Sequence, residues 1–193
     1  MIDTVLIFLR DQVNEHLRIK TGDTSDKLSP INLMTVDGTT DHLPANTLLL
    51  TVVRMEEEKL AKTAPPYIEK VENNYFGFNP EINLNLYLLF SAHFGGQSDQ
   101  YIESLKLLSY VIGFFQTNPF FDQKNSPQLN KEIERITLEL ISPSFETENQ
   151  LWGMLGAKYM PSVLYKLRLV SIREEQIQEK VKIVEELSVQ LDA

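Results

Sequence analysis

The sequence predicts an α+β fold with a mostly antiparallel central sheet flanked by helices. Apolar residues recur every three or four positions from Ile2 to Gly22 and again over 98–117, which is the period of an amphipathic helix. Segments with two-residue alternation follow these helices, at 82–94 and 163–172. Helices and strands do not alternate regularly along the chain, so a doubly wound parallel sheet is not expected.

The first part of the chain predicts a helix followed by two strands. Asp3 or Thr4 places a hydrogen-bond acceptor near the start of the helix, and Gly22 provides a stop after a basic last turn. The strands are expected at 31–36 and 47–55. The segment 47–55 is apolar on both faces, which is typical of a central strand covered on both sides.

The middle of the chain predicts a loop, a strand and a helix. The segment NNYFGFNP at 73–80 is interpreted as a loop with exposed aromatic side chains. Strict alternation makes 82–94 the clearest strand in the sequence. The helix over 98–117, with Ser98 as its N-cap, is expected to bury one face, made of Tyr101, Leu105, Leu108, Ile112 and Phe115.

The last part predicts a strand at 133–141, a short helix at 147–155 that ends at Gly156, and a strand at 163–172. The tail, 173–193, fits either a helix or a short strand, because its apolar residues satisfy both periods. We therefore expect one domain over 1–172 and a C-terminal arm over 173–193.

Composition excludes several classes of protein. The net charge of −9 is spread along the chain without a basic face, so nucleic acid is not an expected partner. No apolar run approaches the ~20 residues of a membrane span, and the N-terminal segment lacks the features of a signal peptide. The absence of cysteine excludes disulfides and thiolate metal sites and is compatible with a cytoplasmic location.

A search for catalytic and cofactor motifs gives none. Gly153, Gly156 and Lys158 superficially suggest a phosphate-binding loop, but that loop needs four residues between its glycines and a hydroxyl residue directly after the lysine. His16, His42 and His93 lie far apart and lack ligand spacing. The sequence therefore predicts no enzyme, no cofactor and no metal site.

Three stretches together resemble a known family. They are NPEINLNLYLLFSAHF (79–94), YIESLKLLSYVIGFFQTNPFF (101–121) and LWGMLGAKYMPSVLYKLRLVSI (151–172). In this order and spacing they are similar to the cap, or tail-terminator, family of phage-tail-like contractile injection systems. The N-terminal helix is similar as well. The residues that we assign to the family motif or to its architecture are Trp152, Gly156, Tyr159, Pro161, Tyr165 and Arg168.

The resemblance implies a structural protein of a bacterial particle. Such caps form a ring, typically a homohexamer, on the distal end of the inner tube and sheath, where they end polymerisation. The expected partners are therefore copies of the chain itself and the sheath and tube proteins, in a particle assembled in the cytoplasm. The resemblance also suggests contact through strands exchanged with neighbouring subunits. Candidate interface residues are Tyr75, Phe76 and Phe78, and in the tail Leu187, Val189 and Leu191.

Two interpretations of the chain stay open at this point. The alternative to a cap is a non-catalytic protein-binding module of another pathway. In either case Trp152 and Tyr159 are expected to pack the corner after the short helix against the sheet. Arg168 is expected to form an ion pair.

Overall fold

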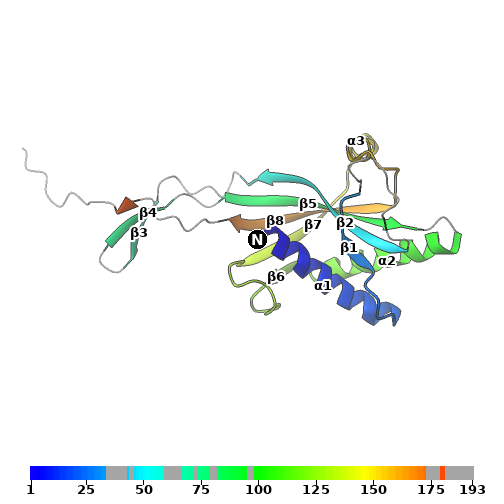
Figure 1. The fold of residues 1–193 in the computed structure, drawn as a ribbon, viewed down its shortest axis with the longest axis horizontal. Helices are drawn as coiled ribbons and strands as arrows, with labels where there is room; N and C mark the ends of the chain where they lie inside the picture. Colours follow the sequence, from blue (N-terminus) through cyan, green and yellow to red (C-terminus); the bar gives the residue numbers. More distant parts are fainter. Residues whose placement is uncertain are drawn as a thin grey trace, which may run out of the picture. The chain divides into compact units, whose positions relative to one another are not determined.

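The computed structural model describes residues 1–33, 43, 46–58, 67–71, 74–78, 82–94, 98–172 and 179–180 (Figure 1). The chain divides into two units. The first consists of Met1–Glu57 and Leu84–Val170, and the second of Glu58–Asn83 and Ser171–Ala193.

The first unit is built on a sheet of six described strands in the order β1-β2-β5-β8-β7-β6. The strands are β1 (Leu28–Pro30), β2 (Thr47–Glu57), β5 (Ile82–His93), β6 (Phe120–Asp122), β7 (Arg135–Ile141) and β8 (Ser162–Ile172). The pairs β2–β5, β6–β7 and β7–β8 are antiparallel, and β1–β2 is parallel. The predicted α+β class is confirmed, with a sheet that is mixed rather than purely antiparallel.

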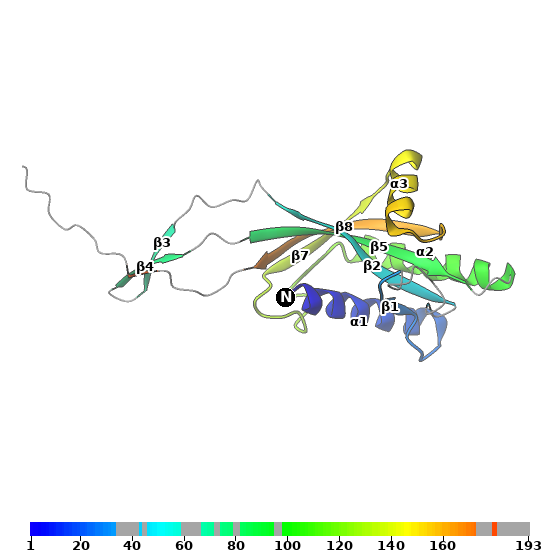
Figure 2. The same cartoon turned by 45° about the horizontal axis from the view of Figure 1, so that its top comes forward.

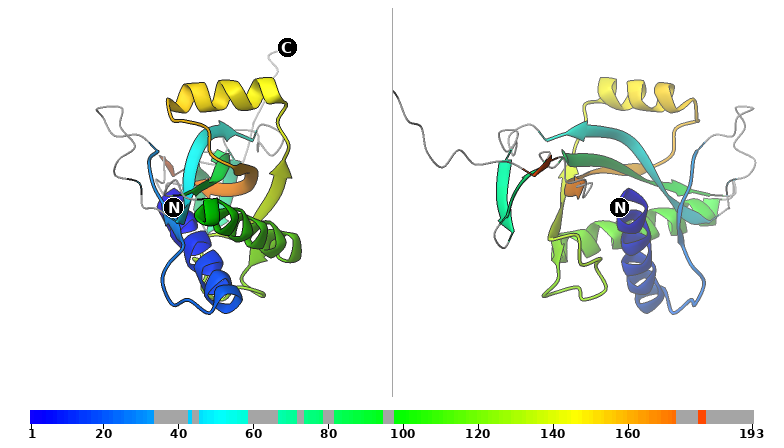
Figure 3. Two further views of the ribbon diagram at one scale, coloured as in Figure 1. Left: turned by 90° about the vertical axis from the view of Figure 1, so that its right-hand side faces the viewer. Right: turned by 60° about the vertical axis from the view of Figure 1, so that its left-hand side comes forward.

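Helices lie on both faces of this sheet. α1 (Ile2–Thr21) and α2 (Ser98–Thr117) lie on one face, and α3 (Phe145–Leu155) lies on the other (Figures 2 and 3). β2 and β5 are central strands, and Leu48–Thr51 and Leu88–Ala92 are buried on both faces. The prediction of a strand buried on both sides at 47–55 therefore holds for its first half.

An aromatic cluster joins α2 to the sheet. The ring of Phe90 in β5 lies 5.4 Å from that of Phe115 in α2 and 5.8 Å from that of Tyr165 in β8. The rings of Phe115 and Tyr165 are 4.9 Å apart. Edge and tilted contacts of this kind add to the free energy gained by burying the rings. They fix α2 over the centre of the sheet.

The buried face of α2 agrees only in part with the predicted one. Tyr101 is 39% exposed, and Leu105 and Ile112 are only partly buried. The helix buries Leu108 and Phe115 as predicted, and it also buries Ser104, Leu107, Val111 and Phe114. The segment is apolar around most of its circumference, so periodicity alone does not determine which side meets the sheet.

The two ends of α1 differ in how well the sequence predicts them. Gly22 ends the helix as expected, in a left-handed conformation with φ 73°, and its N–H donates to the Arg18 carbonyl. The start is at Met1, and no side chain caps it. The Asp3 carboxylate, in the first turn, accepts from the N-terminal amine at 2.7 Å, so the predicted acceptor near the helix start is present, but it does not cap the helix.

The first strand is earlier in the sequence than predicted. β1 covers Leu28–Pro30, residues 31–33 are not strand, and residues 34–36 lie outside the described part of the chain. Its position depends on Asn14 of α1, which is 2% exposed. Asn14 Nδ2 donates to the Leu28 carbonyl at 3.0 Å, and Oδ1 accepts from the Lys27 and Leu28 N–H groups at 2.9 and 2.8 Å. A helix side chain thus holds β1 beside β2.

The C-terminal half of the first unit follows the prediction closely. β7 and β8 lie where strands were expected, and α3 begins two residues earlier than predicted, capped by Ser144. Ile136 and Leu138 are buried as predicted, whereas Leu140 is 48% exposed. β6 was not predicted, because three residues are too few to show a period. Among the described residues, no helix is both long and apolar enough to cross a membrane.

The second unit contains a small antiparallel sheet. Its described strands, in the order β3-β4-β9, are β3 (Tyr67–Val71), β4 (Asn74–Phe78) and β9 (Glu179–Lys180). The predicted loop at 73–80 is therefore wrong over 74–78. Its Asn and Gly residues suggested a loop, but its Tyr and Phe residues favour a strand once β3 pairs with it.

The tail contributes β9 to this sheet, paired with Phe76 and Gly77 of β4. Leu187, Val189 and Leu191 lie outside the described residues. The choice between helix and strand is thus decided for Glu179 and Lys180 alone, and the division of the chain at residues 172 and 173 stays a prediction.

We predict that Asn14→Ala lowers the stability of the chain. The substitution leaves the buried Leu28 N–H and carbonyl groups without their partner, and each such group costs about 1–3 kcal/mol. The measurement is the free energy of unfolding in urea. Asn149→Ala, at an exposed position of α3, is the matched control and should be close to neutral. A loss below about 0.5 kcal/mol for Asn14→Ala would contradict the role assigned to this side chain.

Candidate interaction site on the α3 face

α3 is capped at both ends, and one large side chain, Trp152, anchors it to the sheet. The Ser144 hydroxyl accepts from the Thr147 N–H at 3.2 Å, and Gly156 ends the helix with φ 65°. Trp152 is 5% exposed and lies in an apolar cluster. The other buried members of that cluster are Leu33, Leu43, Leu49, Leu89 and Met160. The predicted packing of this corner against the sheet is confirmed for Trp152.

Tyr159 lies at the outer side of the same corner. Its ring makes an edge contact with Trp152 at 5.8 Å, yet the residue is 63% exposed. Partial burial, with a smaller contribution from the Glu148 carboxylate, raises the pKa of its phenol. Tyr159 therefore presents a neutral aromatic ring to solvent at the edge of the α3 face.

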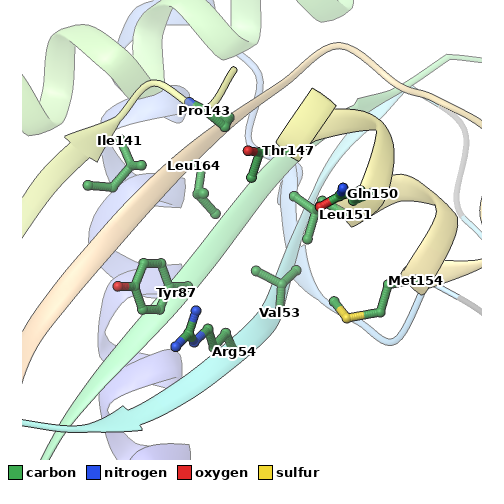
Figure 4. Close-up of a pocket in the computed structure, with 10 residues that line it drawn as sticks. All are labelled: Val53, Arg54, Tyr87, Ile141, Pro143, Thr147, Gln150, Leu151, Met154 and Leu164. Atoms are coloured by element: carbon green, nitrogen blue, oxygen red, sulfur yellow. The ribbon is translucent and has the colours of Figure 1, made fainter. Parts of the chain in front are cut away.

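A groove separates α3 from the strands beneath it (Figure 4). Its volume is ≈ 420 Å³. Side chains from β2, β5, β8, the end of β7 and α3 line it, and most of them are apolar. They are Val53, Arg54, Tyr87, Ile141, Pro143, Thr147, Gln150, Leu151, Met154 and Leu164. Figure 4 shows Met154 and Leu151 on the helix side and Val53 on the strand side. Such walls suit apolar side chains of a partner.

A polar cluster closes one side of this groove. Glu56 of β2 accepts from the Tyr87 hydroxyl of β5 at 2.9 Å and from Lys166 of β8 at 3.1 Å. Arg54 contacts the second oxygen of Glu56 at 3.0 Å. Arg54 and Lys166 each lie 5.6 Å from the centre of the Tyr87 ring. Three neighbouring strands are therefore linked by one carboxylate.

The chemistry of this cluster favours a structural role. Hydrogen bonds from Lys166 and Tyr87 lower the pKa of the Glu56 carboxyl. The carboxylate is thus ionised near neutral pH, and two cations neutralise it. It has no proton to donate there, and its lowered basicity makes it a poor general base.

The remaining motif residues are spread over the unit. Tyr165 is 3% exposed and points into the core, where burial raises the pKa of its phenol. Arg168 pairs with Glu139 at 2.8 Å, with both side chains half exposed, as the sequence predicted. The Pro161 carbonyl accepts from the Ala92 N–H at 2.8 Å and so joins the start of β8 to the end of β5. Only Trp152, Gly156 and Tyr159 gather at one place, the corner after α3.

Sequence reasoning missed the polar cluster. Glu56 and Lys166 are 110 residues apart, and each belongs to an ordinary charged stretch. No local pattern signals their contact. The bulge in β2 between Val52 and Arg54, which changes the alternation of this strand, is equally invisible in the sequence.

The two described histidines, His16 and His93, form no site. His16 packs against Phe114, with ring centres 5.0 Å apart, and burial followed by the nearby Lys20 charge lowers its pKa. His93 is at the end of β5, and His42 lies outside the described residues. Within the part of the chain that the structure describes, no three His, Asp or Glu side chains are grouped in a way that could hold a metal ion.

Exposed apolar side chains occur on α3, in the segment after it and at the end of β7. Phe145 is 91% exposed, Met154 67%, Tyr159 63% and Leu140 48%. Single exposed apolar residues are normal on protein surfaces, but Met154 lines the groove itself and Phe145 begins the same helix. An exposed apolar patch next to an apolar groove marks an interaction site. We take the groove, these four residues and the end of β7 as the candidate site and call it the α3 face.

Comparison with solved structures shows that the fold is that of tube and sheath terminators. One match is the sheath/tube terminator of the PVC extracellular contractile injection system in its extended state, with 12% identity and a TM-score of 0.56. Another is the tube terminating cap of the anti-feeding prophage, with 13% identity and a TM-score of 0.52. They are aligned over 94% and 96% of this chain, but over 62% and 61% of their own lengths. The chain thus spans about three fifths of these proteins.

The sequence itself also matches a family model. The model of the Pvc16 N-terminal domain matches residues 4–186, and the chain belongs to this family. This confirms the resemblance seen in the sequence. A comparison with curated protein sequences gave no significant match.

We predict that Glu56→Gln flattens the loss of stability in acid. The pKa of this carboxyl is lower in the folded chain than its ordinary value of 4.5. Its contribution to stability is therefore complete above about pH 4.5 and is lost as the pH falls through the lower folded value. The unfolding free energy measured from pH 6 to pH 3 should fall less steeply in the variant than in the parent chain. Glu103→Gln, at an exposed position of α2, should keep the steeper fall. Equal slopes for both variants would contradict the assignment.

We also predict that alanine substitutions at Gly153 and Gly156 change the stability of the chain in opposite directions. Gly156 has a positive φ of 65°, so Gly156→Ala should cost about 1–2 kcal/mol. Gly153 lies in the helix, where an added Cβ meets nothing within 4 Å. Gly153→Ala should therefore stabilise the chain by up to about 1 kcal/mol. Thermal unfolding of the two variants measures both effects, and the same sign for both would rule out this description of the corner.

Proposed function

We propose that this chain is a structural, non-catalytic cap component that ends the inner tube and sheath of a contractile injection system. The observation that carries the proposal is its membership of the Pvc16 N-terminal domain family over residues 4–186. The fold shared with two proteins described as a sheath/tube terminator and a tube terminating cap supports it. Because those proteins are longer, the proposal assigns to this chain the part of a cap that its fold represents.

The proposal includes a closed ring of copies, which we take to be a hexamer. A ring requires heterologous contacts, in which each subunit offers one surface to one neighbour and a different surface to the next. The first unit has two dissimilar faces, one covered by α1 and α2 and one only partly covered by α3. Stable contacts of this kind bury on the order of 800 Å² per partner. In this account Trp152, Gly156, Tyr159, Pro161, Tyr165 and Arg168 serve the architecture of the subunit rather than chemistry.

The second unit and the tail complete the proposal. We propose that Tyr75, Phe76 and Phe78 of β4, together with Leu187, Val189 and Leu191, contribute to contacts with neighbouring subunits. The pairing of β9 with β4 supports a common role for the two segments. We further propose that the chain acts inside a bacterial cell during assembly of the particle and stays with the particle, without inserting into a membrane or binding nucleic acid.

A second candidate function is a protein-binding module outside any particle. The groove of ≈ 420 Å³ beside α3 favours it, because this groove is complete in a single chain. The mass of the purified chain in solution separates the two functions. A stable ring supports the cap, whereas a monomer that binds a peptide supports the module.

We predict that removing the gene changes the length of the particles. Electron microscopy of particles from the deletion strain should show tubes and sheaths of uncontrolled length, or no assembled sheaths, because nothing ends their polymerisation. Restoring the gene should restore a uniform length. Particles of normal number and length in the deletion strain would contradict the proposed function.

A further inference from the structure

We propose that the free end of β7 accepts an extended, basic segment of a second protein as an additional strand. The first observation is the length of the neighbouring strand. β6 pairs with residues 135–137 of β7, and the Leu138 N–H donates to the Pro119 carbonyl at 2.9 Å. Beyond Leu138, no described strand lies on this side of β7.

The backbone of Leu140 points toward this open side. Alternate residues of a strand direct their N–H and C=O groups to the same side, so those of Leu140 point the same way as those of Leu138. Opposite Leu140, the chain belongs to the end of α2 and not to β6. There the Asn118 N–H donates to the Phe114 carbonyl. An added strand would supply the missing partners for this edge, as in other cases of strand addition.

Hollows on both faces of the sheet meet at this position. On the α2 face a hollow of ≈ 290 Å³ is lined by Leu140 together with Ile112, Pro119 and Tyr165. On the α3 face a hollow of ≈ 250 Å³ is lined by Leu140 together with Ile141, Glu148, Leu151 and Leu164. The side chains of an added strand would alternate between these two hollows. The contacts inside them would supply most of the affinity, since only a few backbone hydrogen bonds fit on so short an edge.

The other described edges of the sheet are protected in ways that this one is not. β2 has a bulge between Val52 and Arg54 on its outer half, followed by the charged Arg54 and Glu56. β1 ends at Pro30, which lacks a backbone donor, and β6 has only three residues. Bulges, charges, prolines and short strands all discourage pairing with another chain. The end of β7 instead exposes an apolar residue, Leu140.

Charge complementarity indicates the kind of occupant. Glu148 lines the hollow on the α3 face, and Glu146 stands beside it in the first turn of α3. Lys166, the cation nearest in register, is already paired with Glu56, and Arg168 is paired with Glu139. The tail of another copy of this chain is a poor fit, because residues 182–193 contain one lysine and three acidic residues. A partner segment with Lys or Arg beside its apolar residues fits better.

The test uses the full chain and a synthetic peptide of alternating valine and threonine with a lysine at each end. We expect the peptide to bind and to slow hydrogen exchange of the Leu140 amide about tenfold at a concentration ten times its Kd. The amide of Glu139, which faces β8, serves as an internal control and should change little. Unchanged exchange at Leu140 with saturating peptide would overturn the proposal.

Two variants make the test specific. Leu140→Pro removes the outward N–H while the β7–β8 ladder keeps its own donors, and it should abolish binding. Since proline can disturb the strand, Glu148→Lys provides an independent check and should weaken binding about threefold to tenfold. Glu146→Lys, with the same change of charge in the same helix turn, should weaken binding less. Equal effects of the two lysine variants would overturn the assigned position.

The identity of the occupant is tested by two further peptides. A peptide with glutamate in place of the terminal lysines should bind more weakly, and so should a peptide with the sequence of residues 182–193. Tighter binding by the tail peptide would replace the proposed partner with a second copy of this chain. Because these measurements use the isolated chain, their failure would leave the capping proposal intact, and normal particles without the gene would leave the strand site intact.

Discussion

The structure of the first unit depends on the fact that its central strands are apolar on both faces. Leu48–Thr51 of β2 and Leu88–Ala92 of β5 are buried on either side. A sheet of this kind must be covered twice, since each exposed apolar side chain forfeits about 1.5–3 kcal/mol of burial. Two helices of 20 residues, each about 30 Å long, do this on one face. The other face has α3, with 11 residues and a length of about 16 Å.

The α3 face remains partly open because α3 is shorter than α1 and α2. Six strands about 4.8 Å apart make a surface wider than one short helix can cover. Trp152 and the cluster around it cover the part of the face nearest the corner after α3. The paired charges of Glu56, Lys166 and Arg54 give another part of this face a polar surface that water can solvate. Between these regions the apolar groove and the end of β7 remain, and a protein that works by contact with others can use them for docking.

The sequence predicted the elements whose residues contain a full period. α1, α2, β5 and β8 have 11 to 20 residues each, and their alternation or helical spacing is repeated several times. β1 and β6 have three residues each, and their positions depend on distant partners, Asn14 for β1 and β7 for β6. The buried face of α2 was predicted only for Leu108 and Phe115, since that helix is apolar on several sides. The local sequence pattern does not determine the positions of β1 and β6 or the full buried face of α2.

The candidate site was less predictable than the fold. The ion pair of Arg168 and the anchoring role of Trp152 followed from local chemistry. Arg168 is a charged residue on an exposed strand face, and Trp152 is a large indole in the last turn of a helix that ends at Gly156. The groove did not, because its lining comes from five separate segments that only the tertiary fold brings together. The family could be recognised from three quoted stretches, although none of them contains Arg54 or Glu56, which help to close the groove.

The measurement that tests this account most directly is cryo-electron microscopy of the distal ends of intact particles. We expect a closed ring of this chain at that end, with the α3 face and the end of β7 against density from a neighbouring protein. The face of the sheet that α1 and α2 cover should lie away from that contact. A particle end without this chain, or a ring whose α3 face is open to solvent in every subunit, would contradict it.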